Sequence, residues 1–168
     1  MDIVDFVQYN HAVRELYFEA LAKLPWEEAV KPRGASFDSL RNVFLHLTLV
    51  EDRWINYAIP GRLKEWSDQN FDDYTTFDAL KSYMLYTKDR TEEYVQKLTC
   101  EEMNRNIVLP WGNTNDTCVS VETVLTHMVT ENLIHYGELS AMLWQMDKEA
   151  PYLAFWRYMY NKHQQQPR

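Results

Sequence analysis

Apolar residues recur at steps of three and four along most of this chain, the spacing that places them on one face of an α-helix. In the first segment, Phe6, Tyr9, Val13 and Leu16 follow this spacing. The same periodicity returns three more times. It predicts four long amphipathic helices, over residues 2–24, 36–58, 77–98 and 121–146.

Breaker and capping residues separate these helices. Pro25 fits the end of the first helix, because proline cannot continue a helical hydrogen-bond ladder. Thr76 and Ser120 are residue types that cap helix N-termini, and they precede the third and fourth helices. Pro151 fits the first turn of a short final helix that reaches about residue 160.

One segment departs from the helical spacing. Residues 106–119, "NIVLPWGNTNDTCV", place short apolar and β-branched runs on either side of Pro-Trp-Gly-Asn. They predict a small hairpin-like excursion before the fourth helix. Four amphipathic helices with modest connections are typical of an all-α four-helix bundle. We therefore expect one domain over residues 1–160 and a polar tail over residues 161–168.

The composition says more about possible binding partners than about the fold. The 168 residues include 4 glycines and 6 prolines, which suits long helices, and the formal net charge is −8. Without a basic cluster to displace counterions from phosphates, we expect no nucleic-acid partner, and no anionic membrane surface either. No apolar run approaches the roughly 20 residues of a membrane span, and the N-terminal segment lacks signal-peptide features. Cys100 and Cys118 lack metal-like spacing, so a reducing cytoplasm is the expected location.

The fourth predicted helix carries a line of polar side chains within an apolar segment, "THMVTENLIHYGELS". His127, Glu131, His135 and Glu138 follow one another at steps of four, four and three, so they form a slowly winding stripe beside the buried face. His127 and His135 are separated by about 12 Å along the axis. They cannot share one ion bound at about 2 Å by each ligand. The candidate pairs are His127 with Glu131 and Glu131 with His135.

The second predicted helix offers a further ligand, His46. Its neighbours on the inner face are apolar, so the imidazole needs a partner. Two histidines and one glutamate form the ligand set of hydrolytic zinc sites and of non-haem iron oxygenases. A metal centre with open positions is therefore one interpretation. The ordinary alternative is a hydrogen-bonded core histidine and a helix-surface pair of histidine and glutamate.

Three stretches of the chain resemble the DinB/YfiT-like superfamily. They are "QYNHAVRELYFEAL", "SFDSLRNVFLHLTLVEDRWI" and "VETVLTHMVTENLIHYGELSAMLWQMDKEAPYLAFWRYM". The most specific parts are His46 with the downstream Asp52-Arg53-Trp54, and the "HYGE" that runs from His135 to Glu138. The resemblance covers nearly the whole chain.

The resemblance implies an up-down-down-up bundle and a divalent metal held by three histidines, one from the second helix and two from the later helix. The first falls on His46 and the last on His135, whereas the middle one falls on Glu131, a departure from the family pattern. Glutamate can replace histidine as a ligand of zinc, nickel, iron or manganese and lowers the charge of the site by one. His127 matches a histidine that is not usually a ligand.

We also expect roles for residues around this site. Glu138 is a candidate base or hydrogen-bond partner of His135, and Gly137 would let a neighbouring helix or ligand approach closely. Aromatic residues are candidates for the mouth of the site or for plain core: Tyr9, Trp54, Tyr57, Trp111 and Tyr136.

Three functions remain open from the sequence. The resemblance implies a metal-dependent transferase that joins a low-molecular-weight thiol to a small-molecule substrate. A metal-dependent hydrolase could use the same ligands with an activated water. The departure at Glu131 keeps open a non-enzymatic bundle with a degenerate metal site. Related proteins are often dimers, and exposed aromatics such as Trp66 or Trp156 would suit the interface of a homodimer.

Overall fold

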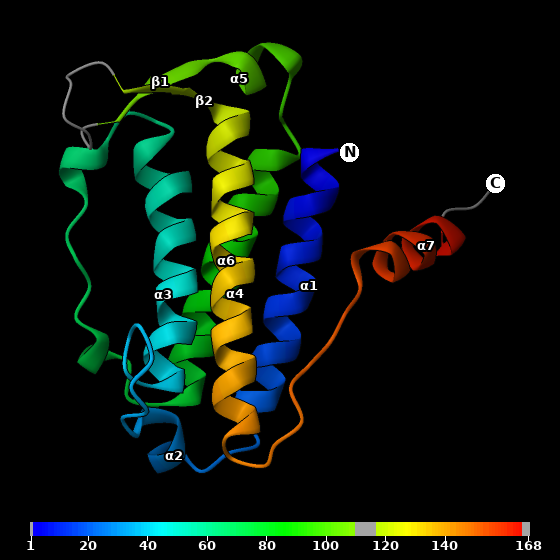
Figure 1. The fold of residues 1–168 in the computed structure, drawn as a ribbon. Coiled ribbons are helices and arrows are strands. Elements are labelled where there is room, and N and C mark those ends of the chain that lie inside the picture. Colours follow the sequence, from blue (N-terminus) through cyan, green and yellow to red (C-terminus); the bar gives the residue numbers. More distant parts are fainter. Residues whose placement is uncertain (1, 110–116, 166–168) are drawn as a thin grey trace.

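Four long helices lie side by side and form the body of the molecule (Figure 1). The structure, a computed structural model, describes residues 2–109 and 117–165. In Figure 1, α1 and α6 descend while α3 and α4 ascend, and α1 packs on α6, α6 on α3, α3 on α4 and α4 on α1. The prediction of an all-α protein is confirmed. The four helices are α1 (Ile3–Leu21), α3 (Leu40–Asp52), α4 (Phe77–Val95) and α6 (Val121–Trp144).

Short elements fill the connections. Two single helical turns, α2 and α5, lie in segments where the sequence analysis expected none. The final helix α7 begins four residues after Pro151 and contacts α1, so the prediction that Pro151 occupies its first turn is wrong. It also extends into the segment predicted to be a polar tail. These elements are α2 (Trp26–Val30), the 3₁₀ turns η2 (Leu63–Glu65) and η3 (Phe71–Asp73), α5 (Cys100–Asn104) and α7 (Phe155–Gln165).

Tyr9 and Phe155 show why the last helix starts late. The Tyr9 hydroxyl donates a hydrogen bond to the carbonyl of Leu153 at 2.7 Å. The Tyr9 ring meets the ring of Phe155 edge-on at 5.1 Å. These contacts tie the chain before α7 to the side of α1, and residues 151–154 have no regular secondary structure. Packing against α1 therefore outweighs the preference of Pro151 for a helix start.

The predicted hairpin is present next to α6. Strands β1 (Asn106–Val108) and β2 (Cys118–Ser120) pair antiparallel, with Ile107 opposite Val119. Ser120 then caps α6, because its hydroxyl accepts a hydrogen bond from the Thr123 amide at 3.1 Å. The segment between the strands lies partly outside the described residues.

The second predicted helix differs at both ends. It begins at Leu40 rather than near residue 36, because Ser39 caps it and Asp38 adopts a left-handed backbone with φ 70°. At its other end the α-helix widens into a π-helix, η1 (Arg53–Ala58). The Ile59 amide bonds the carbonyl five residues earlier, at 2.9 Å. Widened turns of this kind often mark functional sites.

None of the helices in the described ranges is long and apolar enough to cross a membrane. Their apolar faces pack into two clusters of buried side chains, one around Phe44 and Leu139 and the other around Ile55 and Leu125. The buried faces thus meet inside the bundle, as the periodicity predicts.

A charged group lies at the centre of this apolar interior. Glu51 on α3 is fully buried and accepts hydrogen bonds from Arg14 Nη1 at 2.6 Å, His11 Nε2 at 2.9 Å and Thr91 Oγ1 at 2.5 Å. Burial would raise the pKa of Glu51, but Arg14 and His11 outweigh it and hold that pKa well below its usual range. The carboxylate therefore stays ionised and joins α1, α3 and α4.

The first prediction concerns this carboxylate. Glu51→Ala should lower the free energy of unfolding by roughly 3–5 kcal/mol, because it leaves the Arg14 guanidinium buried without its counter-charge. Urea denaturation measures the loss. Glu28→Ala, which removes the more exposed carboxylate bonded to Arg33, is the control and should cost much less. Equal losses in the two variants would contradict the assigned role of Glu51.

The second prediction concerns pH. Burial lowers the pKa of His11, but Glu51 and Glu92 outweigh burial and the nearby Arg14, and the pKa ends above its ordinary 6.5. The protonated imidazole therefore adds stability that is complete below about pH 6.5 and is lost as the pH rises through the raised value. Urea titrations from about pH 6 to about pH 9 should show a decline in stability that His11→Gln makes shallower. If the free energy of unfolding declined equally with pH in wild type and in His11→Gln, the assigned role of His11 would be refuted.

Candidate metal centre

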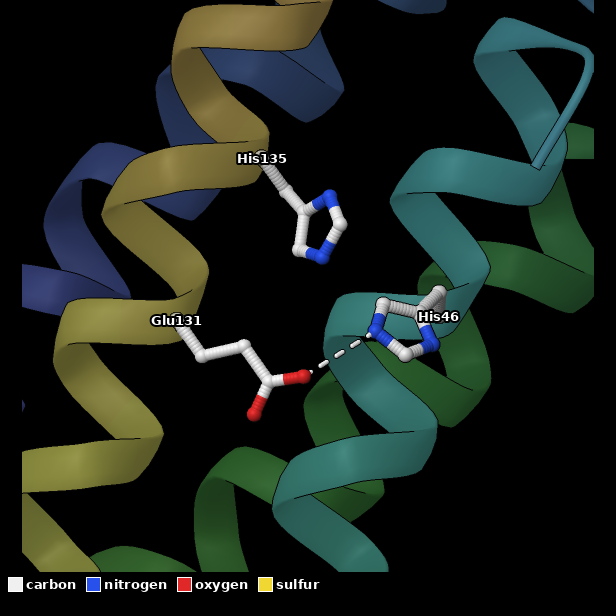
Figure 2. Close-up of side chains that lie close together, drawn as sticks. All are labelled: His46, Glu131 and His135. Carbon is white, nitrogen blue, oxygen red and sulfur yellow. Dashed lines mark hydrogen bonds and ion pairs between the residues drawn. The ribbon is translucent and has the colours of Figure 1, made fainter. Parts of the chain in front are cut away.

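Three side chains from two neighbouring helices converge on one point (Figure 2). His46 comes from α3, and Glu131 and His135 come one turn apart from α6. One ligand-type atom of each lies within 4.8 Å of the other two, and all three side chains are partly buried. The nearest pair is His46 Nε2 and Glu131 Oε1, 3.4 Å apart. This group could hold a metal ion.

The donor chemistry fits a divalent cation. Ligand atoms that share one ion at about 2 Å lie roughly 3–4 Å from each other, so small side-chain movements would close this group. The hydrogen bond from His46 lowers the pKa of Glu131, although burial opposes the effect. Glu131 is therefore ionised, as a carboxylate ligand must be. Imidazole and carboxylate together suit zinc, nickel, iron or manganese.

His127 contacts the same glutamate from the outer side. Its Nε2 lies 3.1 Å from Glu131 Oε2, while the ring meets Trp54 edge-on at 5.7 Å. The imidazole is more than half exposed. Of the two pairs that helical spacing leaves open, the structure joins Glu131 and His135 to His46, and it places His127 beside this group.

Glu138 holds His135 and a loop at once. It accepts hydrogen bonds from the backbone amide of Ser36 at 2.5 Å and from the Ser36 hydroxyl at 2.7 Å. Its Oε2 also lies 2.9 Å from His135 Nδ1. Burial would raise the pKa of Glu138, but these contacts lower it below its ordinary value. Both carboxylate oxygens of Glu138 thus have hydrogen-bond partners. Because Glu138 contacts Nδ1 of His135, the other ring nitrogen, Nε2, is left for a metal ion.

Phe37 covers one side of the group. Its ring stacks on His46 with centroids 3.9 Å apart and an interplanar angle of 22°, and it lies 5.6 Å from the ring of His135. The sequence analysis named neither Phe37 nor Ser36 as a site residue. Both lie in the segment before α3, and no local pattern marks them, because their contacts join distant parts of the chain.

The other side opens into a hollow of about 320 Å³ between α3 and α6. It is lined by His46, Val50, Arg53, Trp54, His127 and Glu131. A larger hollow of about 620 Å³ lies elsewhere, between the C-terminal part of α1 and residues 148–152. Of these two hollows, the smaller one has two of the three candidate ligands, His46 and Glu131, in its wall.

The expected aromatic mouth is only partly formed. Trp54 lines the hollow, whereas Tyr9 and Tyr136 are buried in the core. Tyr57 packs against Trp66, which is partly buried rather than exposed as expected. Trp111 lies outside the described residues.

Gly137 and Asp52 belong to the two motifs that carry the resemblance. Gly137 does not let a helix approach closely, because a Cβ added there would meet nothing within 4 Å. Asp52 accepts hydrogen bonds from Tyr83 Oη at 2.5 Å and from the Asn56 side-chain amide at 2.6 Å. The acidic position of the Asp-Arg-Trp motif therefore ties α3 to α4.

Comparisons with known proteins give two matches over most of the chain. A family model described as "DinB family" matches residues 2–168. A protein of Bacillus subtilis (strain 168) described as "Uncharacterized protein YizA" is 26% identical over 138 residues, which cover 82% of this chain and 84% of that protein.

The third prediction concerns the clamp between Glu138 and Ser36. Glu138→Ala should speed hydrogen exchange at the Ser36 amide by about tenfold or more, because that amide loses its charged acceptor. Hydrogen–deuterium exchange followed by peptide mass spectrometry measures it. Glu122→Ala, an exposed glutamate on the same helix, should leave the exchange unchanged. An unchanged rate in Glu138→Ala would show that the carboxylate does not hold the loop.

Proposed function

Because the chain belongs to the DinB family, we propose that it is a divalent-metal-binding enzyme of the thiol S-transferase type, with His46, Glu131 and His135 as ligands. The observation that carries the proposal is the convergence of these three side chains between α3 and α6. We also take the four long helices as the up-down-down-up bundle of that family, in keeping with the chain directions in Figure 1.

The proposed reaction joins a thiol to an electrophilic carbon. A sulfur–carbon bond forms, the bond from that carbon to its leaving group breaks, and the thiol proton passes to solvent. The metal, when bound, supplies Lewis acidity that favours the thiolate, which is the nucleophile. Glu138 keeps His135 in one orientation, and partners of this kind are worth about 10–100-fold in metal affinity. Phe37 shields one face of His46 from water.

The hydrolytic alternative has less support. It would use Glu138 as the base that activates water, but both oxygens of Glu138 already bond to Ser36 or His135. The non-enzymatic alternative would have Glu131 as a relic of a lost site. Its ionised state and its position between two histidines favour a ligand instead.

Two broader expectations accompany the proposal. Cys100 and Cys118 are exposed free thiols, which is compatible with a reducing cytoplasm. Trp144, Tyr152 and Trp156 are exposed aromatics that would suit the interface of a homodimer.

The fourth prediction tests the metal and the reaction together. Protein purified without an affinity tag and loaded with zinc should hold about one equivalent of metal and conjugate a thiol to monochlorobimane, releasing chloride. Glu131→Gln should weaken metal binding by more than about 10–100-fold, because it removes the anionic ligand. Elemental analysis and bimane fluorescence provide the two readouts.

Matched controls complete this test. Glu122→Gln lies on the same helix and His163→Gln lies on α7, and both should bind metal and react as wild type does. Full metal content in His46→Ala and Glu131→Gln would refute the ligand assignment. A metal-loaded protein that turns over no thiol in a panel, yet cleaves esters or amides without thiol, would favour the hydrolase.

A further inference from the structure

Protein covers one side of the ligand group. Phe37 lies against His46, and Glu138 binds both His135 and the loop at Ser36, so this side is occupied by protein. On the other side, the hollow of about 320 Å³ has His46 and Glu131 in its wall. A small molecule in this hollow would therefore meet two of the three candidate ligands.

Arg53 places a cation in the wall of the hollow. His46, Val50 and Arg53 follow one another at steps of four and three residues, so they lie along one face of α3 and of η1, which continues it. Side chains on a helix lean toward its N-terminus, which directs Arg53 back along the face toward His46. The two positions are about 10 Å apart along the axis, and the long arginine side chain shortens that gap.

The charges in the hollow favour an anion. Among its six lining residues, Arg53 supplies a permanent cation and Glu131 the one carboxyl group. In the proposed enzyme the divalent metal outweighs the charge of Glu131, so the field in the hollow is positive at both ends. A second hollow shares His46, Val50 and Arg53 but carries the carboxylate of Asp68, which makes it less suited to an anion.

We propose that Arg53 binds a carboxylate of the thiol substrate whose sulfur reaches the centre formed by His46, Glu131 and His135. The inference rests on the proposed function and adds a substrate class, the carboxylate-bearing thiols. Arginine is suited to this task, because its planar fork matches a carboxylate through two parallel hydrogen bonds. The apolar side chains of Val50 and Trp54 contact the carbon chain between sulfur and carboxylate. Arg53 is thus a residue that determines specificity.

The test compares three small probes on the zinc-loaded protein. 3-Mercaptopropionate carries the carboxylate, 3-mercaptopropionamide replaces it with a neutral amide of similar shape, and propionate lacks the thiol. Calorimetry reports their binding, and intrinsic tryptophan fluorescence provides a second readout. Wild type should bind the acid about 10–100-fold more tightly than the amide, as expected for a charge-assisted hydrogen bond. Arg53→Gln should remove most of this preference.

Three further variants test whether the preference depends on the charge of Arg53. Arg53→Met serves in place of Arg53→Gln where the latter holds less zinc than wild type, because it keeps the apolar stem. Arg53→Lys retains the charge and should keep part of the preference. Arg62→Gln is the control, since Arg62 is an exposed arginine bonded to the carbonyl of Asn56, and it should bind all probes as wild type does.

Each outcome separates this inference from the proposed function. Equal binding of acid and amide to wild type, or a preference that survives in Arg53→Gln, overturns the role of Arg53 and leaves thiol transfer standing. Propionate that binds in an Arg53-dependent manner while neither thiol binds through its sulfur supports the anion site and overturns thiol transfer. A protein that binds none of the three overturns both.

Discussion

The buried carboxylate of Glu51 fixes how the helices are turned. A buried ion pair gives little net stability over apolar residues of the same volume, but it penalises any arrangement that leaves one charge unpaired. Glu51 meets donors from α1 and α4, so α3 cannot rotate or slide without exposing Arg14 to an apolar interior. Glu51 lies five positions after His46 on α3. Their side chains therefore point in directions about 140° apart around the helix axis. Holding Glu51 toward α1 and α4 therefore turns His46 toward α6.

Helix α6 likewise directs one polar side chain into the core and another toward a neighbouring helix. Tyr136 is buried, donates to the backbone carbonyl and the side-chain oxygen of Asn10, and stacks on Tyr17 with ring centroids 4.9 Å apart. His135 is one position away, about 100° around the helix, and faces α3. Each of the two site helices thus has one polar face held in the interior and another directed at its neighbour. The candidate metal centre lies where the second faces meet.

The sequence predicts the four long helices well, because they depend on local spacing, and the structure brings His46, Glu131 and His135 close together. The caps at Thr76 and Ser120 and the short hairpin also follow from residue types near one another in the chain. The π-helix after Asp52 does not, since its bonds depend on how the end of α3 packs. The partners of Glu51 were missed although polar residues on the inner face of the first helix, His11 and Arg14, were a usable signal.

Contacts that complete the site join distant segments, which is why spacing could not show them. Ser36 and Glu138 are 102 residues apart. Phe37 lies over His46 because the left-handed backbone at Asp38 turns the chain sharply before Ser39 caps α3. These contacts depend on tertiary structure and were found only in the folded chain.

The glutamate that departs from the family pattern provides something a histidine could not. A ligating histidine offers one nitrogen to an ion and has a single further nitrogen for an orienting partner. Glu131 has two oxygens with several acceptor sites, and it directs Oε1 toward His46 while Oε2 meets His127. His127 is too far along the helix to share an ion with His135, yet it holds the carboxylate from outside and contacts Trp54 in the wall of the hollow. Glu131 therefore extends the network of the candidate centre through His127 to the wall of the hollow.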